Sequence, residues 1–585
     1  MSMYELSKYF LPAACFLLLA AFFMLLPDLR SCRLAGETAS RRLQRADALL
    51  MALLTVIYAV LAFSGLGNTR SPRSFVNMEG RTAAIRLDPD GGEAGQLMLF
   101  TGVGIGSYTI DYTAENGETR LLAQVEQSHA EVLKWLPVEL DRPLTGGTIR
   151  IRGSGNVWLG ELVARTREGT VIPADADAPE LTDEQALCPA RQTFMNSTYF
   201  DEIYHARTAW EHLNRVFPYE ITHPPLGKLI IALGIRLFGM TPFGWRFSGT
   251  LFGVLMLPIL YIFSKKLFGG RLVPTACTAL MLTDFMHFVQ TRISTIDTYA
   301  VFFILLMYLF MYLFVSEGKL RWLALCGVSF GLGAASKWTC FYAGAGLAVI
   351  WLLWVIRGMR TDRLRFAGFV KNALFCVVFF VLVPGLIYGL SYLPYGIAQG
   401  RTNPFSREYL QIVLDNQRYM FNYHSQLVAT HPYSSHWYQW LLDIRPILYY
   451  LDYLPDGRHI SFGAFVNPVL CWGGLMALFV LIYLAAARRD QPSAFILIGY
   501  LAQLLPWVLV PRLTFAYHYF PCTVFLALAL GRCFDLMERN HPKGRLLVGG
   551  FVCLSAAVFV LFYPCLAGLP VYPGILRSWL PTWPF

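Results

Sequence analysis

The sequence predicts an all-α polytopic membrane protein of about 12 transmembrane helices, with an inserted β-sandwich-like module outside the membrane. Three observations support this prediction. Hydrophobic residues make up 55% of the 585 residues and charged residues only 15%, whereas roughly a quarter of a soluble chain is charged. The apolar residues are gathered in blocks that are long enough to cross a bilayer. The basic residues alternate between the loops that join those blocks.

Twelve runs of roughly 17–23 mostly apolar residues are each long enough to span a membrane as a helix. They cover 9–27, 47–65, 247–266, 272–290, 297–315, 321–338, 340–356, 370–392, 464–486, 492–511, 513–531 and 546–568. The first run lacks a basic leader and a small-residue cleavage site, and Arg30 and Arg33 follow it. We therefore expect it to be a membrane helix rather than a signal peptide.

The Lys and Arg residues test this helix count, because cytoplasmic loops carry an excess of them. Every second loop is basic, and the short loops between carry a single basic residue each, namely Arg292, Lys337 and Arg512. The alternation places both termini and two long regions, about 66–246 and 393–463, on the extracytoplasmic side of the cell membrane. The net charge of +10 is then mostly a topology signal, and no nucleic-acid partner is expected.

The first long external region is predicted to begin with β-structure. Short alternating segments with Gly and Asn turns indicate a compact sandwich over about 75–175. Carbohydrate binding is one hypothesis for this module, and a passive spacer or packing module is the simpler one. Beyond it, 200–216 and 226–239 have helical periodicity without enough apolar residues to span, so we expect helices along the outer membrane surface.

The predicted organisation therefore has six consecutive parts. They are two membrane helices with a cytoplasmic loop (1–66), the β-rich insertion (67–195), a catalytic first external loop with surface helices (196–246), membrane helices three to eight (247–392), a second external loop (393–463) and membrane helices nine to twelve (464–585).

The adjacent acids Asp201 and Glu202 are the first candidates for chemistry. Neighbouring residues on a helix diverge by about 100°, so only one of the two carboxylates can face a given substrate atom. A structural interpretation competes with this one, because Thr198 and Asp201 have the spacing of a capping box and acids favour a helix N-terminus.

Further candidates are basic residues near the external ends of the helices. His223 and Lys228 flank the turn HPPLGK, where an anionic headgroup could sit. Arg292 follows Asp284, an acid within a predicted span that is functional by default or pairs with Arg292 or a neighbouring helix. Lys337 and Arg512 stand alone in tight external loops, where snorkelling or a shared anion would explain them.

The second external loop is rich in His and aromatic residues beside Arg445. His424, His431 and His436 lack the helical spacing of a metal-ligand pair with an acidic third ligand, and the 12 Cys residues form no C-x-x-C pair, so no metal site is expected. Trp437 and Trp440 suit sugar stacking or a membrane-interface belt equally.

Several motifs in order resemble the protein O-mannosyltransferase family. They are FDEIYH, THPPLGK, FVQTRISTID, GAASKW, the loop YHSQL…HPYSSHWYQWLLDIRPI and the helix pair PWVLVPRLTFAYHYFP, which together run from about 195 to 535. The resemblance implies the C-type glycosyltransferase fold, with an active site at the external face. It also implies transfer of mannose from a polyprenyl-phosphate carrier to Ser or Thr hydroxyl groups of exported proteins, with inversion at the sugar.

The resemblance also implies roles for the candidate residues. Asp201 is the expected base, with Glu202 orienting the acceptor or donor, and the essential arginine of the family corresponds to Arg292. The residues expected to bind the donor are His223, Lys228, Arg292, Lys337, Arg445 and Arg512. Those expected to contact the acceptor or sugar are His424, His431, Trp437 and Trp440. No cofactor beyond the lipid-linked donor, polyprenyl-phosphate-mannose, is required.

Two departures from the eukaryotic pattern indicate a bacterial member. The loop 393–463 is too short for the β-trefoil module of eukaryotic members, and the β-rich stretch at 75–175 is extra. The acceptor therefore stays open between exported proteins and a glycolipid or cell-wall polymer, and a transporter of lipid-linked sugars is a distant alternative. The expected partners are the donor, the acceptor and the lipid bilayer, with the protein export machinery as an open candidate.

Overall fold

A computed structural model describes residues 3–34, 40–572 and 579–584 of the chain, with side chains from Phe10 onward. The chain forms two compact units. We call Met1–Ser64, Ile221–Leu229 and Gly249–Phe585 the membrane unit, and Gly65–Glu220 and Ile230–Ser248 the insertion unit. Each unit is described by itself.

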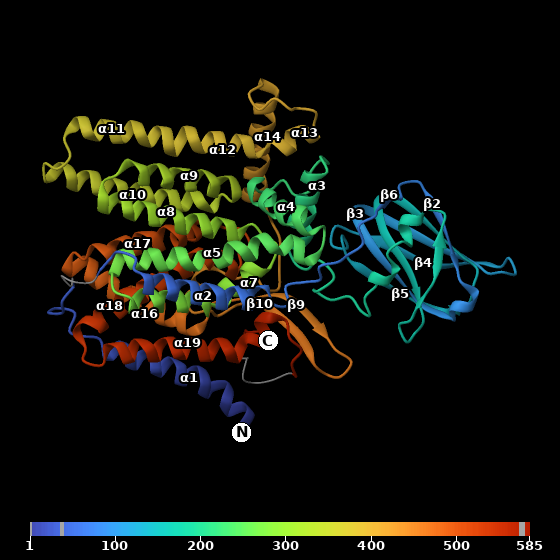
Figure 1. The fold of residues 1–585 in the computed structure, drawn as a ribbon, viewed down its shortest axis with the longest axis horizontal. Helices are drawn as coiled ribbons and strands as arrows, with labels where there is room; N and C mark the ends of the chain where they lie inside the picture. Colours follow the sequence, from blue (N-terminus) through green and yellow to red (C-terminus); the bar gives the residue numbers. More distant parts are fainter. Residues whose placement is uncertain (1–2, 35–39, 573–578, 585) are drawn as a thin grey trace. The chain divides into compact units, whose positions relative to one another are not determined.

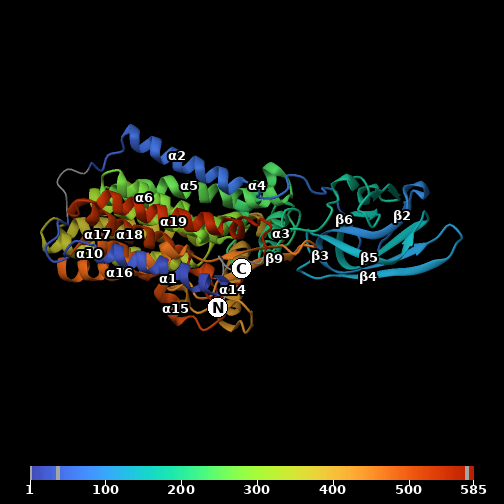
Figure 2. The same cartoon turned by 90° about the horizontal axis from the view of Figure 1, so that it is seen from below.

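The membrane unit is a bundle of helices that run side by side (Figures 1 and 2). The helices are α1 (Met3–Met24), α2 (Arg45–Phe63), most of α5 (Pro242–Phe268), α6 (Leu272–Leu282), α7 (Phe285–Arg292), α8 (Asp297–Glu317), α9 (Leu320–Ser336), α10 (Thr339–Arg360), α11 (Phe366–Val377), α12 (Val383–Ser391), α13 (Leu393–Ala398), α14 (Arg407–Gln426), α15 (Trp437–Trp440), α16 (Pro468–Arg488), α17 (Gln491–Leu504), α18 (Phe520–Asn540) and α19 (Gly544–Ala567). A hairpin of β9 (Ile447–Tyr453) and β10 (His459–Ala464) precedes α16.

Each of the twelve predicted spans coincides with apolar helix in the structure. Among the described residues, nine stretches are long and apolar enough to cross a membrane, and α6 with α7 forms a tenth that is bent by 54°. The remaining two predictions fall on the shorter apolar helices Phe10–Met24 and Leu320–Ser336. The prediction of a polytopic helical membrane protein is therefore confirmed.

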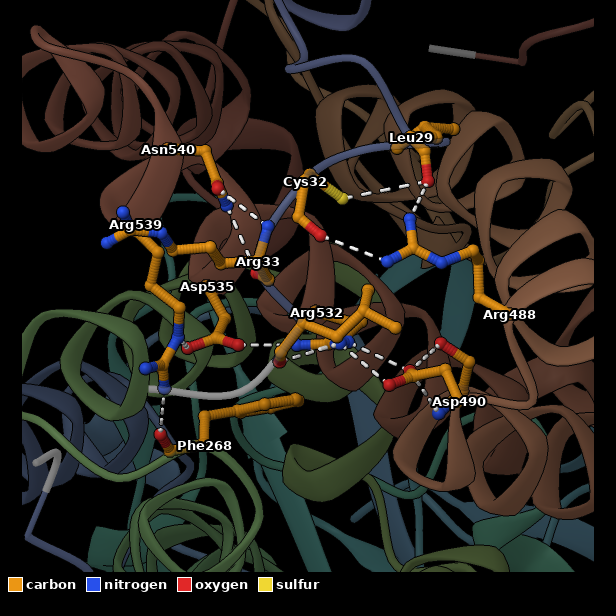
Figure 3. A network of polar contacts seen from close by, with 12 residues as sticks. Leu29, Cys32, Arg33, Phe268, Arg488, Asp490, Arg532, Asp535, Arg539 and Asn540 are labelled. Carbon is orange, nitrogen blue, oxygen red and sulfur yellow. Dashed lines mark hydrogen bonds and ion pairs between the residues drawn. The ribbon is translucent and has the colours of Figure 1, made fainter. Parts of the chain in front are cut away.

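Loops that the sequence assigned to one face meet at one end of the bundle. Arg532 binds Asp490 (2.7 Å) and Asp535 (2.5 Å), and Asp535 also binds Arg539 (2.6 Å). Arg488 donates to backbone carbonyls of the loop after α1, such as that of Cys32 (3.1 Å). Figure 3 shows these side chains, which we call the arginine network, converging from α16, α17 and α18.

The insertion unit contains an antiparallel sheet of eight strands in its described residues. The strands are β1 (Val76–Asn77), β2 (Thr82–Leu87), β3 (Ala94–Thr113), β4 (Thr119–Gln127), β5 (Trp135–Leu144), β6 (Thr148–Arg165), β7 (Val171–Ile172) and β8 (Ala174–Ala176). The order is β4-β3-β6-β2-β8, β5 also pairs with β3, and β1 and β7 pair with β6. The predicted β module is therefore confirmed, and its apolar core includes Leu97, Ile110 and Ile151.

Two long strands replace some of the short segments that the sequence suggested. Gly102, Gly104 and Gly106 lie inside β3, which spans 20 residues, rather than at turns between short segments. The register against β6 shifts between Thr101 and Gly104. Gly104 has φ of +104°, and a Cβ atom there would lie 1.8 Å from the carbonyl oxygen of Asn156. Glycine therefore allows a close approach of the two backbones at an irregular point of the sheet.

The insertion unit also contains α3 (Glu202–Leu213) and most of α4 (Leu226–Phe238). Both helices were predicted, at 200–216 and 226–239. One face of α3 buries Ile203, Ala206 and Ala209. The apolar residues of α3 therefore fix the helix within this unit, which sets the position of the acidic pair at its start.

Candidate active site

Asp201 is the N-cap residue directly before α3 and is half-buried, but its side chain makes no capping hydrogen bond. The expected capping box is absent from this helix start, because the Thr198 hydroxyl donates to the carbonyl of Val132 (2.9 Å) instead. The structural interpretation of Asp201 as a helix cap is therefore wrong. The preceding residue, Phe200, has φ of +45°, a left-handed conformation that bulky residues rarely adopt and that is often found at functional sites.

Glu202 is fully buried, at 0% exposure, and bound by an arginine. Arg246, at the start of α5, donates from Nε to Oε1 (2.7 Å) and from Nη2 to Oε2 (2.7 Å). Trp245 donates its indole N–H to Oε2 (3.1 Å). A two-pronged pair of this kind fixes the direction of the carboxylate. Glu202 therefore anchors α3 to α5, and a role in orienting the acceptor or donor stays a prediction.

Sequence reasoning missed Arg246. It is buried, its guanidinium also donates to the carbonyls of Leu66 (2.8 Å) and Ser197 (3.1 Å), and it stacks over the ring of Tyr199 at 4.8 Å. The signal that could have found it is its place, a lone basic residue at the start of a predicted span. Arg292, Lys337 and Arg512 were singled out by that same feature.

The opposite side of α3 is held by a second buried ion pair. Arg207 Nε binds Glu211 at 2.8 Å and its guanidinium lies 4.1 Å from the ring centre of Tyr219. Burial raises the pKa of Glu211 above its ordinary value, although the charge of Arg207 opposes this shift. The backbone N–H of Tyr219 also donates to Glu211 (2.6 Å). Ion pairs on both sides therefore make α3 a rigid support for Asp201.

In the membrane unit, three basic side chains gather around His424, which lies near the end of α14. The rings of His223 and His424 are 5.2 Å apart, and His424 Nε2 lies 2.8 Å from the carbonyl oxygen of Thr222. Burial, together with the nearby charges of His223, Arg512 and Lys337, lowers the pKa of His424 to about 4. We call His223, Lys337, His424 and Arg512 the cation cluster.

The cation cluster contains one close ion pair. Lys337 Nζ lies 2.6 Å from Asp297 Oδ1, at the start of α8, and 5.6 Å from the ring centre of Tyr517. Arg512 forms no ion pair with a carboxylate of the described chain. The cluster therefore carries more positive than negative charge, which is the arrangement that binds an anion.

Lys228 and Arg292 are bound to backbone carbonyls in the same unit. Lys228 Nζ donates to the carbonyl of His223 (3.0 Å) and is buried. Arg292, the last residue of α7, donates from Nη2 to the carbonyl of Ser64 (2.7 Å) and lies 4.7 Å from the ring centre of Phe288.

The expected alternative that Asp284 pairs with Arg292 is wrong. Asp284 caps α7 by accepting from the backbone N–H of His287 (3.1 Å), and it also accepts from the backbone N–H of Asn467 (3.1 Å). Its carboxylate therefore fixes the bend between α6 and α7 and leaves the guanidinium of Arg292 to other partners.

The aromatic loop before β9 supports the cluster. Trp440 is 2% exposed, donates to the Ser435 hydroxyl (2.9 Å) and stacks on His518, with ring centres 6.0 Å apart. Trp440 is thus packed into the interior of the unit, and its contact with the acceptor or sugar stays a prediction. Sequence reasoning missed His518, which lies 4.3 Å from Trp507.

The other candidates of this loop lie around it. Arg445 donates to the carbonyl of Pro432. His431 packs against Phe515 with ring centres 5.1 Å apart, and Trp437 packs edge-on against Tyr438 at 5.8 Å. The structure thus brings together the four members of the cation cluster, while Asp201 and Glu202 belong to the insertion unit.

Comparisons with known proteins match two regions of the chain, which contain the residues of the cation cluster. Residues 222–388 match the family described as dolichyl-phosphate-mannose-protein mannosyltransferase. Residues 409–583 match the C-terminal four-helix membrane region of protein O-mannosyltransferase.

Two relatives and one solved structure are similar over most of their own length. The polyprenol-phosphate-mannose–protein mannosyltransferase of Mycolicibacterium smegmatis is 26% identical over 450 residues, which cover 66% of this chain and 87% of the relative. The protein of that name from Corynebacterium glutamicum is 24% identical over 62% of this chain and 81% of its own. The structure of the Saccharomyces cerevisiae protein O-mannosyltransferase Pmt1–Pmt2 complex bound to the sugar donor aligns with a TM-score of 0.57, at 14% identity, over 66% of this chain and 89% of that chain.

The helical bundle, with its acidic pair and its basic motifs, is a membrane glycosyltransferase of the C-type fold. Both matched family regions and the bacterial relatives agree on the family, and the expected resemblance is confirmed. The chain belongs to the protein O-mannosyltransferases, as a member of the bacterial type.

Proposed function

We propose that the protein transfers mannose from a polyprenyl-phosphate carrier to Ser or Thr hydroxyl groups of exported proteins, at the extracytoplasmic face of the cell membrane. The observation that carries the proposal is the split between the two adjacent acids. Glu202 is fully used in a buried pair with Arg246, whereas Asp201 stands at the start of the same helix without a capping role. The family and its curated bacterial relatives support the donor and the acceptor.

Asp201 is the proposed general base. The acceptor oxygen attacks the anomeric carbon of mannose as the bond from that carbon to the phosphate oxygen breaks, and the hydroxyl proton passes to the Asp201 carboxylate. One displacement inverts the configuration at the sugar. The transition state resembles an oxocarbenium ion, so proton transfer is late and an ordinary carboxylate is basic enough.

The cation cluster and Arg292 are the proposed site for the leaving phosphate. Polyprenyl phosphate departs with developing negative charge, and fixed cations stabilise that charge. An arginine presents a fork of N–H groups that matches phosphate geometry, so Arg292 and Arg512 suit direct contact better than Lys337 does. This proposal assigns the charge stabilisation to side chains and requires no metal ion in the reaction.

The proposed orientation of the protein across the membrane rests on the Lys and Arg content of the loops. The arginine network joins loops that are rich in Lys and Arg, which are typical of the cytoplasmic side. The motifs with a single basic residue then face outward, where nucleotide sugars are absent and a lipid-borne donor is needed. Exported proteins reach that side, which keeps the export machinery a candidate partner.

Asp201→Asn tests the base. We expect turnover to fall about 10²–10⁴-fold, the usual range for a lost general base. The melting temperature should change little, because asparagine keeps the size of the side chain and α3 has no capping bond from Asp201 to lose. Binding of polyprenyl phosphate should also persist. Radiolabelled mannose transfer from polyprenyl-phosphate-mannose, with thermal unfolding of the same preparations, measures all three properties.

Glu202→Gln is the companion variant. It leaves Arg246 buried without its charge partner, so we expect a lower melting temperature together with any loss of activity. An Asp201→Asn enzyme with near-normal turnover would contradict the assignment of the base. Supplying Ser/Thr peptides and glycolipid acceptors in parallel identifies the acceptor class, and transfer to the glycolipid alone would overturn the protein acceptor.

A further inference from the structure

Three carboxylates of the insertion unit face one another away from the residues discussed above. Glu161 comes from β6, and Asp183 and Glu184 come from the segment that follows the sheet. One oxygen atom from each residue lies within 4.8 Å of the other two. Glu161 is fully buried, Glu184 is half-buried and Asp183 is exposed. The group therefore has one deep ligand and an open side toward solvent.

The charge of Glu161 is poorly compensated in the described chain. Its Oε1 atom is buried and has no hydrogen-bond partner there, while Oε2 accepts from the backbone N–H of Glu184 (3.2 Å). Arg165, the buried arginine of the same strand, donates instead to Gln96 and to the carbonyl of Pro189 (2.8 Å).

The surrounding backbone keeps the acidic segment in place. The Ser74 hydroxyl donates to Asp183 Oδ2 (2.8 Å), and the backbone N–H groups of Arg73 and Ser74 point to Glu184 Oε2. These bonds hold like-charged side chains together although mutual repulsion and desolvation disfavour the arrangement. No lysine, arginine or histidine of the described chain forms an ion pair with any of the three.

We propose that Glu161, Asp183 and Glu184 bind a calcium ion, which ties β6 to the segment 182–184. Calcium is coordinated by oxygen atoms at about 2.3–2.6 Å, so ligands on opposite sides of the ion lie about 5 Å apart. The three carboxylate oxygens all lie within 4.8 Å of one another, so a single calcium ion can reach all of them. Magnesium demands a near-ideal octahedron at about 2.0–2.1 Å, which one strand residue and two neighbouring loop residues do not impose, so the flexible coordination of calcium suits this group better. Water fills the remaining positions on the exposed side of Asp183.

This site is independent of the transferase chemistry and gives the module a structural role. Calcium-binding modules outside the cell have dissociation constants of about 10⁻⁴–10⁻³ M, because the ion is abundant there. A site with a buried carboxylate and two further acids is expected to have a dissociation constant within that range or lower. The insertion unit is then expected to be more stable in the presence of calcium than after its removal.

Calorimetric titration of the full-length protein, purified in detergent and freed of metal by a chelator, tests the proposal. We expect calcium chloride to bind at one site per chain with a dissociation constant on the order of 10⁻⁵–10⁻³ M and to raise the melting temperature. Glu161→Gln should lose both effects. Without calcium this variant should be at least as stable as the unsubstituted protein, because it removes a buried acid and keeps its volume. Glu126→Gln, an exposed acid on β4, should bind calcium normally.

Equal calcium binding by the unsubstituted protein and Glu161→Gln would overturn the site. Should Glu161→Gln fail to fold, Asp183→Asn and Glu184→Gln decide, since their side chains are not deeply buried. Each is expected to weaken calcium binding at least about tenfold by losing one charged ligand, and normal affinity in both would refute the proposal. Magnesium chloride at the same concentration should not raise the melting temperature, and an equal rise would refute the assignment to calcium.

Discussion

The arginine network and the cation cluster of the membrane unit differ in how their charges are balanced. In the arginine network, Arg532 meets two carboxylates, Asp490 and Asp535, and also donates to the carbonyl of Leu34 (3.1 Å). Asp490 in turn caps α17 by accepting from the backbone N–H of Ser493 (3.1 Å). Both carboxylates and the guanidinium are buried and hydrogen-bonded on several sides (Figure 3).

The cation cluster has the opposite balance. Among its four basic side chains, Lys337 has the carboxylate of Asp297 within ion-pair distance. His424 Nδ1 is buried and has no partner within the described chain. Buried charge that is fully paired serves structure, whereas surplus charge around an unpaired ring nitrogen leaves room for an anion. The difference supports the proposals that the arginine network stabilises the bundle and that the cation cluster binds the phosphate of the donor.

Breaking the arginine network should have the largest effect on stability. Arg532→Met removes the shared partner of two buried carboxylates, and breaking a buried pair on one side costs about 3–5 kcal/mol. We expect a clear drop in melting temperature and in yield, with transfer per folded molecule nearly unchanged. Thermal unfolding in detergent, alongside mannose transfer normalised to folded protein, measures both.

Arg545→Ala is the matched control for that variant. Its pair with Glu538 spans 3.2 Å but the Arg545 side chain is 83% exposed. Exposed ion pairs contribute about 0–1 kcal/mol, so the melting temperature should hardly change. If both variants were equally stable, the buried network would not hold the bundle together.

Neutralising Arg512 should have a smaller effect, which weakens donor binding and leaves stability intact. Arg512→Gln removes a cation that has no carboxylate partner in the described chain, so stability should stay constant or rise slightly. A lost hydrogen bond to a charged phosphate costs about 1.5–3 kcal/mol, which corresponds to about 10–150-fold weaker binding of polyprenyl phosphate. Binding and transfer assays on the purified enzyme measure the loss.

The comparison with Lys337→Gln sharpens this result. That variant leaves Asp297, the partner of Lys337, without its ion pair, so it should lose stability as well as donor affinity. An Arg512→Gln enzyme that binds the donor normally but melts early would place Arg512 in the structural class and contradict the surplus-charge argument.

The membrane helices could be predicted from sequence because their signal is local. A run of apolar residues marks a span wherever it lies, but the sequence does not reveal which spans form the centre of the bundle. An 18-residue apolar stretch within Ala516–Asn540 is 94% buried in the structure, whereas one within Phe366–Ala398 is only 6% buried. Both are apolar, because lipid and a helical core favour the same side chains. The bend at Asp284 was missed because the apolar run 272–290 predicts one span whether or not the helix is broken within it.

The candidate site could be predicted where a charged residue occurs in a loop or helix end that has few other charges. Arg292, Lys337 and Arg512 were found because basic residues are rare in those loops, and Asp201 because the acidic pair matches a family motif. The partner of Glu202 was missed, since Arg246 lies 44 residues further along the chain and no local pattern links the two. The split in roles between adjacent acids depends on that distant contact.

The smallest expected effect is a pH dependence that originates in His424. Its pKa falls from 6.5 to about 4 in the folded protein, first through burial and then through the nearby cations. Between these values the unfolded chain binds a proton that the folded chain does not, so stability falls as the pH is lowered from 6.5 towards 4 and is fully present above 6.5. The loss should be about 1–3 kcal/mol.

His424→Gln, which can still donate to the carbonyl of Thr222, should remove this part of the pH dependence. Saturating polyprenyl phosphate should make the slope of the unsubstituted protein shallower, because an anion in the cluster favours the protonated ring. Melting temperatures from pH 4.5 to 7.5, with and without the lipid, provide the measurement, and parallel curves for the two proteins would show that His424 does not sense the charge of the cluster.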